Sequence, residues 1–271
     1  MSNKPRDEHV AVPELLRHPL EALSVFTPEA LLKTVRFERG LSEEPVPRVC
    51  ILEFDGDLTD WLVASGIAAP WPSWACFHTR MHSLNVDDRP VGMVARTIGG
   101  PYAVLIAEQL ASSGAQIILG LTSAGRVSPD LSIPSLVLVQ RAVRDEGTSF
   151  HYLPPSRTVE GDLPLIERLQ DHLSGLGLPV ARGTIWTTDA PYRETAEQLE
   201  RYAREGVLAV EMQAASLLAF GVARGVRCGV VAHVTNGFGH SSDEQFDKGP
   251  PDSGLALIQA IARGAYAALD R

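Results

Sequence analysis

The chain has 271 residues, 45% of them hydrophobic and 21% charged, which is typical of a globular protein with one sizeable buried core. The formal net charge of −9 speaks against a surface for nucleic acids or an anionic membrane. The sequence predicts no membrane span and no signal peptide. Its three cysteines are far apart, so we expect reduced, buried thiols in a cytoplasmic protein: Cys50, Cys76 and Cys228.

The N-terminal part differs from the rest of the chain. Residues 1–12 are polar, and we expect them to form a disordered arm. Thr27 and the proline after it predict a helix with Thr27 as N-cap, which runs to about Glu38 and ends near Gly40. We therefore divide the chain into two parts: an N-terminal arm with a helical extension, residues 1–46, and an α/β domain, residues 47–271.

The second part alternates predicted strands and helices. Apolar runs followed by turn residues predict buried strands at 49–54, 91–95, 117–121, 135–143, 183–188, 207–211 and 226–234. Helices are predicted at 99–113, at 163–176, after residue 213, and at 252–269 with Asp252 as N-cap. The pattern predicts a three-layer α/β fold, with a mixed, twisted central sheet flanked by helices on both faces. The long polar stretch 235–254 is interpreted as a mobile lid.

One stretch stands out, residues 207–226. A short apolar strand delivers Glu211, Met212 and Gln213 to a turn, and an alanine-rich helix follows at once. Polar side chains at the end of a buried strand are costly without partners, and α/β proteins bind ligands at that edge of the sheet. The alternative is an ordinary strand–helix junction.

The Glu-Met-Gln-Ala-Ala segment at 211–215 resembles the sugar-binding segment of the nucleoside phosphorylase family, which includes uridine phosphorylase, purine nucleoside phosphorylase and methylthioadenosine nucleosidase. Further matching pieces follow the family's order between residues 47 and 269. They are Gly-Gly-Pro-Tyr at 99–102, Thr-Ser-Ala-Gly at 122–125, the segment 144–152, Thr-Asp-Ala-Pro-Tyr-Arg at 188–193, and Val-Thr-Asn at 234–236. The resemblance implies a nucleoside phosphorylase-like fold and cleavage of an N-glycosidic bond.

The resemblance assigns the sugar to Met212 and Gln213, with Ser123 beside them. Relatives have a glutamate where this chain has Gln213. An amide can hydrogen-bond a ribose diol but offers no negative charge to the developing sugar cation, which removes roughly a few kcal/mol of transition-state stabilisation unless another carboxylate compensates. Glu211 is the candidate for that compensation. The alternative is that Glu211 is held by backbone groups or an arginine.

The base side of the site is expected to involve Thr188, Asp189, Tyr192 and Arg193. Tyr192 is a candidate to stack on the base, and Arg193 to bond its carbonyl oxygens; the alternative for Arg193 is a salt bridge with a nearby glutamate. Asn236 is a third catalytic candidate, beside Gln213 and Glu211. It stands where purine-cleaving relatives have an aspartate that protonates the base, and an asparagine can only hydrogen-bond.

The phosphate site departs most from the family. Three arginine positions of the relatives align with uncharged residues here: Leu58, Gly120 and, across a subunit contact, Phe77. Ser123 and the backbone near Gly125 remain, and a turn of backbone amides can bind an anion. Among the arginines that could replace the lost charge, Arg96 is the best candidate because it precedes a helix start; the alternative is that Arg96 is a surface or structural residue. Three functions therefore stay open: phosphorolysis, hydrolysis without phosphate, and nucleoside binding without turnover.

The remaining expectations concern partners. The sequence has no zinc-like spacing of His, Cys, Asp or Glu and no dinucleotide or triphosphate motif. We expect no metal and no cofactor, with phosphate as a possible co-substrate and a small-molecule nucleoside as the ligand. The resemblance implies a homo-oligomer, because relatives complete each pocket from a neighbouring subunit.

Overall fold

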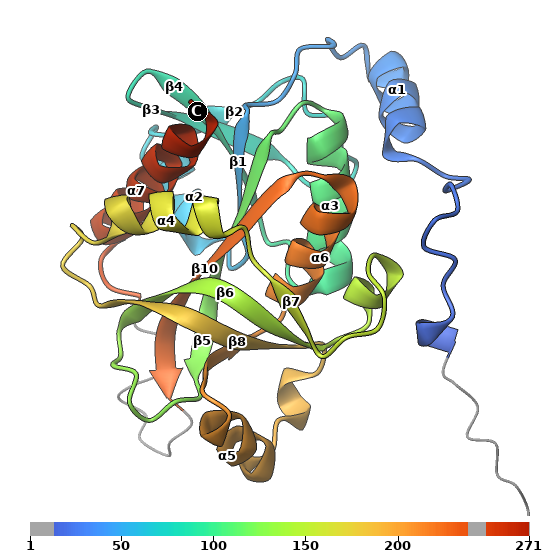
Figure 1. Ribbon diagram of the computed structural model, residues 1–271. Helices are drawn as coiled ribbons and strands as arrows, with labels where there is room; N and C mark the ends of the chain where they lie inside the picture. The colour runs from blue at the N-terminus through green and yellow to red at the C-terminus, as the bar shows by residue number, and fades with distance from the viewer. Residues whose placement is uncertain (1–13, 238–247, 271) are drawn as a thin grey trace, which may run out of the picture.

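The computed structural model describes residues 14–237 and 248–270, and it is an alternating α/β structure as predicted (Figure 1). The expected arm and the centre of the expected lid lie outside these residues. The strands are β1 Val49–Glu53, β2 Ala69–Pro70, β3 Met81–Val86, β4 Arg89–Ala95, β5 Ile117–Arg126, β6 Ser135–Asp145, β7 Thr158–Glu160, β8 Val180–Thr188, β9 Val207–Glu211 and β10 Arg227–Gly237. The helices are α1 Pro28–Arg39, α2 Asp57–Ala64, α3 Gly100–Ser112, α4 Leu163–Leu173, α5 Ala196–Arg204, α6 Ala214–Arg224 and α7 Pro251–Leu269, with 3-10 turns η1 Glu14–Leu16, η2 Thr148–His151 and η3 Pro191–Arg193.

The strands form one mixed sheet in the order β10-β6-β8-β9-β5-β1-β4-β3-β2. β1 lies between β4 and β5 and is parallel to both, and β8 is parallel to β6 and β9. β10 is antiparallel to β6 and also pairs along the whole of β5, so strands β5, β10, β6, β8 and β9 close into a circuit. The predicted mixed sheet is confirmed, and the closure is a feature that strand patterns alone do not indicate.

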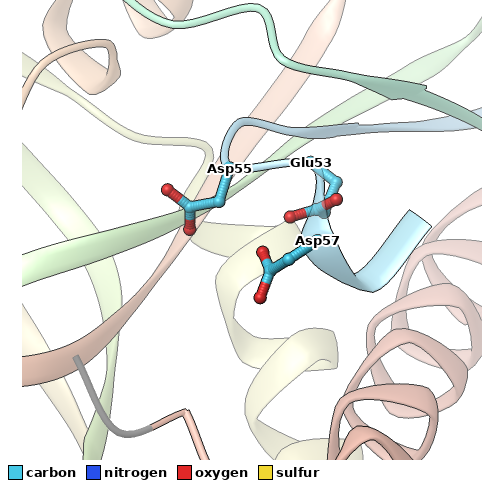
Figure 2. Close-up of side chains that lie close together, drawn as sticks. All are labelled: Glu53, Asp55 and Asp57. Atoms are coloured by element: carbon cyan, nitrogen blue, oxygen red, sulfur yellow. The ribbon is translucent and has the colours of Figure 1, made fainter. Parts of the chain in front are cut away.

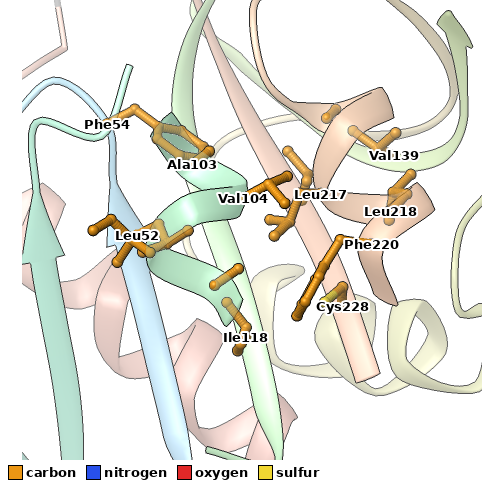
Figure 3. Close-up of a cluster of buried hydrophobic side chains, with 14 of the residues drawn as sticks. Leu52, Phe54, Ala103, Val104, Ile118, Val139, Leu217, Leu218, Phe220 and Cys228 are labelled. Carbon is orange, nitrogen blue, oxygen red and sulfur yellow. The ribbon is translucent and has the colours of Figure 1, made fainter. Parts of the chain in front are cut away.

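Apolar side chains from the sheet enter two separate core layers because successive residues of a strand point to opposite faces. Figure 3 shows the first layer, where Leu52 and Ile118 of the sheet pack with Val104 of α3 and with Leu217 and Phe220 of α6. The second layer lies on the other face and joins the sheet to α2, α4 and α7. Its members include Ile51, Leu119, Leu62 of α2, Leu165 of α4 and Ile258 of α7. Fully burying each such side chain contributes about 1.5–3 kcal/mol.

Several helix ends follow the local signals. The Thr27 side chain accepts a hydrogen bond from the Ala30 amide at 3.3 Å, and Gly40 ends α1 with a left-handed φ of 61°. α7 begins one residue earlier than predicted, because Pro250 occupies the N-cap position and Asp252 lies in the first turn. α4 ends at Leu173, three residues before the predicted end.

β5 is the most important departure from the prediction. It continues to Arg126, five residues beyond the predicted end, because β10 supplies backbone partners along its whole length. Thr122, Ser123 and Gly125 therefore belong to a strand and not to a turn. The helices α2 and α5 and the strands β2, β3 and β7 were not predicted. Thr195 and Gln198 form a capping box at the start of α5. In the described part of the chain no helix is long and apolar enough to cross a membrane.

Candidate active site

A cavity of about 770 Å³ opens where β1 and β9 end beside the second half of β5. It brings together most of the residues expected at the sugar and base sides. Its lining residues are Asp55, Ile98, Thr122, Ser123, Asp189, Ala190, Pro191, Tyr192, Arg193, Glu211, Met212 and Gln213. The cavity therefore joins segments that are far apart in the sequence at the strand edge where α/β proteins bind ligands.

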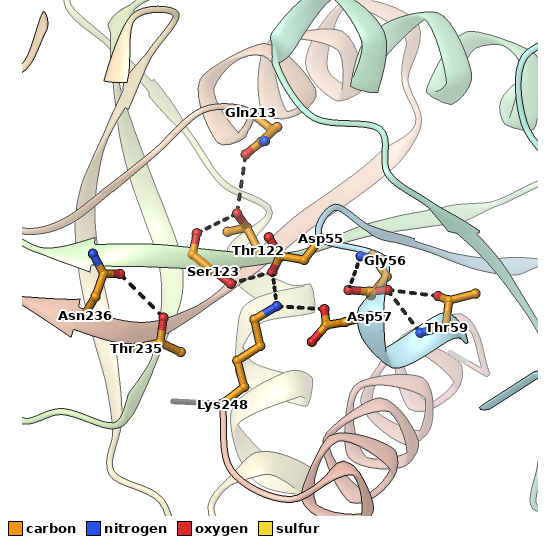
Figure 4. A network of polar contacts seen from close by, with 11 residues as sticks. Asp55, Gly56, Asp57, Thr59, Thr122, Ser123, Gln213, Thr235, Asn236 and Lys248 are labelled. Atoms are coloured by element: carbon orange, nitrogen blue, oxygen red, sulfur yellow. Dashed lines mark hydrogen bonds and ion pairs between the residues drawn. The ribbon is translucent and has the colours of Figure 1, made fainter. Parts of the chain in front are cut away.

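The pairing of β5 with β9 explains why the sugar-side residues meet. The two strands are antiparallel, with Gly125 opposite Val210, so the residues after β9 lie beside those before Gly125. The Thr122 hydroxyl lies 3.4 Å from Gln213 Oε1, which also accepts a hydrogen bond from the Met212 amide at 3.1 Å (Figure 4). These two contacts hold the Gln213 side chain at the cavity wall. Ser123, the residue after Thr122, lines the same wall.

Glu211 is buried and caps α6. Its carboxylate accepts hydrogen bonds from the Thr187 hydroxyl at 2.6 Å and from the amides of Gln213 at 2.7 Å and Ala214 at 2.9 Å. Burial raises the pKa of Glu211 to about 7, against the lowering effect of these hydrogen bonds. Both carboxylate oxygens are occupied, so the geometry agrees with the alternative that Glu211 is held by backbone groups. It fixes the turn that carries Gln213.

The base side of the cavity comes from the end of β8 and from η3. Asp189 accepts a hydrogen bond from the Gly147 amide at 2.8 Å, and Tyr192 is fully exposed at the rim. Arg193 also lines the cavity and has no salt bridge within the described residues. Thr188 is buried behind this wall, where its hydroxyl accepts a hydrogen bond from the Ala190 amide at 3.2 Å.

Asn236 and Gly125 are not brought to the described wall of this cavity. They lie opposite each other on β10 and β5, and Asn236 Oδ1 is 3.5 Å from the Thr235 hydroxyl. The reason is the strand order, because β10 runs along the edge of β5 that faces away from β9. The expectation that Asn236 borders the same cavity as Gln213 is therefore not met.

Arg96 is also away from the described cavity wall. Its guanidinium makes two hydrogen bonds to the Asp60 carboxylate, one of them 3.0 Å long, on the exposed side of the β1–α2 turn. The hydrogen bonds and charge of Asp60 raise the pKa of Arg96. The backbone of Arg96 has a left-handed φ of 61°, and its amide donates to the Glu53 carbonyl. These contacts replace the predicted phosphate-binding role with a structural one.

Asp55 is the residue that the sequence reasoning missed. It follows β1, lines the cavity, and its Oδ2 atom accepts a hydrogen bond from the Ser123 hydroxyl. The Lys248 ammonium lies 2.9 Å from the same oxygen and 2.7 Å from Asp57 Oδ1 (Figure 4). Burial is the largest single effect on the pKa of Lys248 and lowers it, but the two aspartates together outweigh it and raise the pKa overall. The position of Asp55 directly after a buried strand is a sequence signal for a site residue. No such signal marks Lys248, which comes from a distant segment of the chain.

Three carboxylates gather at this point, and Figure 2 shows Glu53, Asp55 and Asp57 side by side. Their ligand atoms lie within 4.8 Å of one another, a spacing that a metal ion could use. Glu53, however, accepts hydrogen bonds from the Gly56 amide and from the amide and hydroxyl of Thr59. Lys248 supplies the positive charge between the two aspartates. Each of the three carboxylates thus already has a protein partner, and we assign no metal to this group.

A second, smaller cavity of about 110 Å³ lies on the other side of Asp55 and Ser123. Asp55, Thr122 and Ser123 line both cavities and form the wall between them. Leu58, which stands at a family arginine position, lines the small cavity together with Asp57 and Lys248. Among the described residues that line this cavity, Glu53, Asp55 and Asp57 are acidic, whereas Lys248 and His233 are the basic side chains.

The fold and this cavity define an α/β protein with an open cavity at the carboxyl ends of its strands, the edge at which α/β proteins bind small ligands. A family model described as the phosphorylase superfamily matches residues 48–263, and the chain belongs to this family.

Three relatives illustrate the similarity. Uridine phosphorylase of Thermococcus kodakarensis is 29% identical over 187 residues, which are 61% of this chain and 66% of the relative. Uridine phosphorylase of Escherichia coli is 25% identical over 163 residues, 55% of this chain and 64% of the relative. Guanosine phosphorylase of Halorubrum lacusprofundi is 26% identical over 177 residues, 63% of this chain and 73% of the relative. The chain thus spans slightly less than two thirds of the first two relatives.

Proposed function

We propose that this chain cleaves the N-glycosidic bond of a nucleoside. The observation that carries the proposal is the single cavity that combines Ser123 and Gln213 with Tyr192 and Arg193. The family relationship supports it, because the relatives are named as phosphorylases of uridine, guanosine and purine nucleosides. Family membership also favours phosphate as the nucleophile.

The proposed roles follow from the charges that develop in the reaction. The sugar becomes positively charged as the base leaves, and Gln213 and Met212 hold its hydroxyls without adding negative charge. The Asp55 carboxylate, on the same cavity, supplies the negative charge that Gln213 lacks. Arg193 and Tyr192 receive the base, where a guanidinium stabilises the electrons that the base gains. Positioning within the cavity supplies the rest of the rate.

The proposal extends to the organisation of the protein. Residues 47–271 form the catalytic unit and residues 1–46 an extension to it, and the protein works as a homo-oligomer in the cytoplasm. Exposed apolar side chains support a subunit contact: Phe37, Phe77, Leu105 and Val222. Light scattering on the purified protein tests the oligomer, and a monomer at micromolar concentration would contradict it.

The test of the function is release of free base from a panel of nucleosides: uridine, guanosine, inosine and adenosine. Each is assayed with and without phosphate, for the wild type, for Gln213→Ala, and for the surface variant Gln116→Ala as a matched control. We expect release by the wild type and the control and a large loss in Gln213→Ala. Binding of a nucleoside without release under either condition would instead support the non-catalytic alternative, which the amide at Gln213 favours.

A further inference from the structure

Among the residues that the structure describes, the wall beneath the expected sugar position carries more negative than positive charge. Asp55 and Asp57 contribute two carboxylates, and both contact the Lys248 ammonium. Glu53, also lining the small cavity, is a third carboxyl, and burial raises its pKa. A phosphate dianion is normally held by arginines, which offer two parallel charge-assisted hydrogen bonds. Here it would face an acceptor-only carboxylate at the place where it has to sit.

The hydroxyl that would help to bind phosphate is also engaged. Ser123 donates its hydrogen bond to Asp55 Oδ2, and Lys248 contacts the same oxygen (Figure 4). Phosphate could recruit these two donors only by taking them from Asp55, which would leave that carboxylate unpaired beside the anion. The charge and the hydrogen bonding therefore disfavour phosphate and suit a neutral nucleophile.

We propose that the nucleophile is water and that Asp55 is the general base that activates it. The inference rests on the proposed nucleoside cleavage and specifies its chemistry. Oδ2 of Asp55 is held by Ser123 and Lys248, whereas Oδ1 accepts no hydrogen bond from the residues that the structure describes. Asp55 lines the same cavity as Met212 and Gln213, so Oδ1 is the oxygen that can accept a hydrogen bond from a water beneath a bound sugar.

The step balances without a co-reactant other than solvent. The water oxygen forms a bond to the anomeric carbon and gives one proton to Asp55. The bond between that carbon and the base nitrogen breaks, and its electron pair leaves with the base. The base takes a proton from solvent in the open cavity, and Asp55 returns its proton to solvent. The products are the free sugar and the free base.

The experiment measures the two possible sugar products, free sugar and sugar 1-phosphate, from a nucleoside that the protein cleaves. Reactions run in phosphate-free buffer and in buffer with added phosphate at constant ionic strength. The variants are Asp55→Asn and, as a matched control on the neighbouring surface, Asp60→Asn, which removes the exposed partner of Arg96. Calorimetry measures nucleoside binding by each protein and shows whether the variant still folds and binds.

We expect free sugar in phosphate-free buffer, a rate that added phosphate does not raise, and no change in Asp60→Asn. Asp55→Asn should lower kcat about 100-fold or more, the usual contribution of a general base, and leave nucleoside affinity within about threefold. A phosphate-dependent rate with sugar 1-phosphate as product would overturn this inference and leave the proposed function intact. A kcat for Asp55→Asn within a few fold of the wild type would also overturn it. Absence of both turnover and binding for every nucleoside would refute the proposed function itself.

Discussion

At the scale of single residues, Gln213 is the residue that we propose as the main contact of the sugar. It is buried to 3% exposure, and its amide is aimed by Thr122 and by the Met212 backbone. A buried amide that binds a diol leaves polar partners unpaired when it is removed. The position is also where the chain departs from its relatives, because an amide replaces a carboxylate.

Replacement of this side chain gives the first prediction. Gln213→Ala should weaken nucleoside binding by roughly 1–3 kcal/mol, the cost of unpaired polar groups. Gln213→Glu should raise the rate of glycosidic cleavage, because a carboxylate favours the sugar cation. Calorimetry and a base-release assay measure the two effects, with Gln116→Ala as the control. Unchanged affinity in Gln213→Ala would remove this residue from the site.

Glu211 gives a prediction about pH. Its pKa in the folded state is about 7, above the ordinary value of 4.5, so the folded protein binds this proton more tightly than the unfolded chain. The stabilising contribution is fully present below pH 4.5 and is lost as the pH rises through about 7. Between about pH 5 and about pH 8, the free energy of unfolding of the wild type should therefore fall by at most about 3 kcal/mol more than that of Glu211→Gln. Urea titrations at about pH 5 and about pH 8 measure this difference.

The matched control for this experiment is Glu200→Gln, which changes an exposed glutamate. Its free energy of unfolding should follow that of the wild type at both pH values. If Glu211→Gln also follows the wild type, the carboxyl of Glu211 is ionised in the folded protein at both values, and the prediction is wrong.

The sequence could predict individual site residues only where a local pattern marked them. Glu211 to Gln213 were predictable because polar residues directly follow an apolar run. Ser123 was identified through its resemblance to the family, although its strand is longer than the local pattern indicates. The contact of Asp55 with Lys248 was not predictable, because the register of distant segments decides it. For Arg96 the ion pair with Asp60, one turn into an unpredicted helix, agrees with the alternative of a structural residue, and the sequence did not indicate that partner.

At the scale of elements, the starts of α3 and α6 pack unusually closely. A Cβ atom added at Gly100 would lie 2.2 Å from Ser216 Oγ and 3.0 Å from Ser216 Cβ. The Ser216 hydroxyl donates a 2.5 Å hydrogen bond to the buried Glu146 carboxylate, so it is not free to move aside. This contact places the helix that follows Gln213 against the helix that follows the Gly-Gly turn.

The third prediction is that Gly100→Ala destabilises the protein by about 1–3 kcal/mol, the usual cost of overpacking. The matched control is Gly175→Ala, where no atom lies within 4 Å of the added Cβ and φ is not left-handed. The control should be neutral or stabilised by up to about 1 kcal/mol, since alanine restricts the unfolded chain. Chemical denaturation measures both. Equal stability of the two variants would show that α3 and α6 separate at little cost.

The order and type of most elements were predictable, since strands and helices differ in the period of their apolar residues. Their ends were less predictable where tertiary contacts decide them. α2 is an example. Its N-cap is Gly56, which has no side chain to accept a hydrogen bond from the helix, and the Glu53 carboxylate on the preceding strand accepts the hydrogen bonds of the Gly56 and Thr59 amides instead. α5 does carry a local signal, the capping-box pair Thr195 and Gln198, so the start of this helix is predictable from the sequence.

At the scale of the whole molecule, the net charge of −9 disfavours the binding of an anion, and so do the carboxylates of Asp55 and Asp57. We predict that inorganic phosphate binds weakly, with a Kd on the order of millimolar or higher, because the family arginine positions are uncharged. Isothermal titration with phosphate measures this, and chloride at the same ionic strength is the control. Micromolar binding would show that another cation holds the anion.

The circuit formed by β5, β10, β6, β8 and β9 has a consequence for the order of events on the ribosome. β5 leaves the ribosome well before β10, which is its partner along its whole length. Until then β5 and β6 have open edges that can pair with other chains. The nascent chain therefore closes the circuit only after β10 has been synthesised, although the residues that line the cavity, from Asp55 to Gln213, all precede β10 in the sequence.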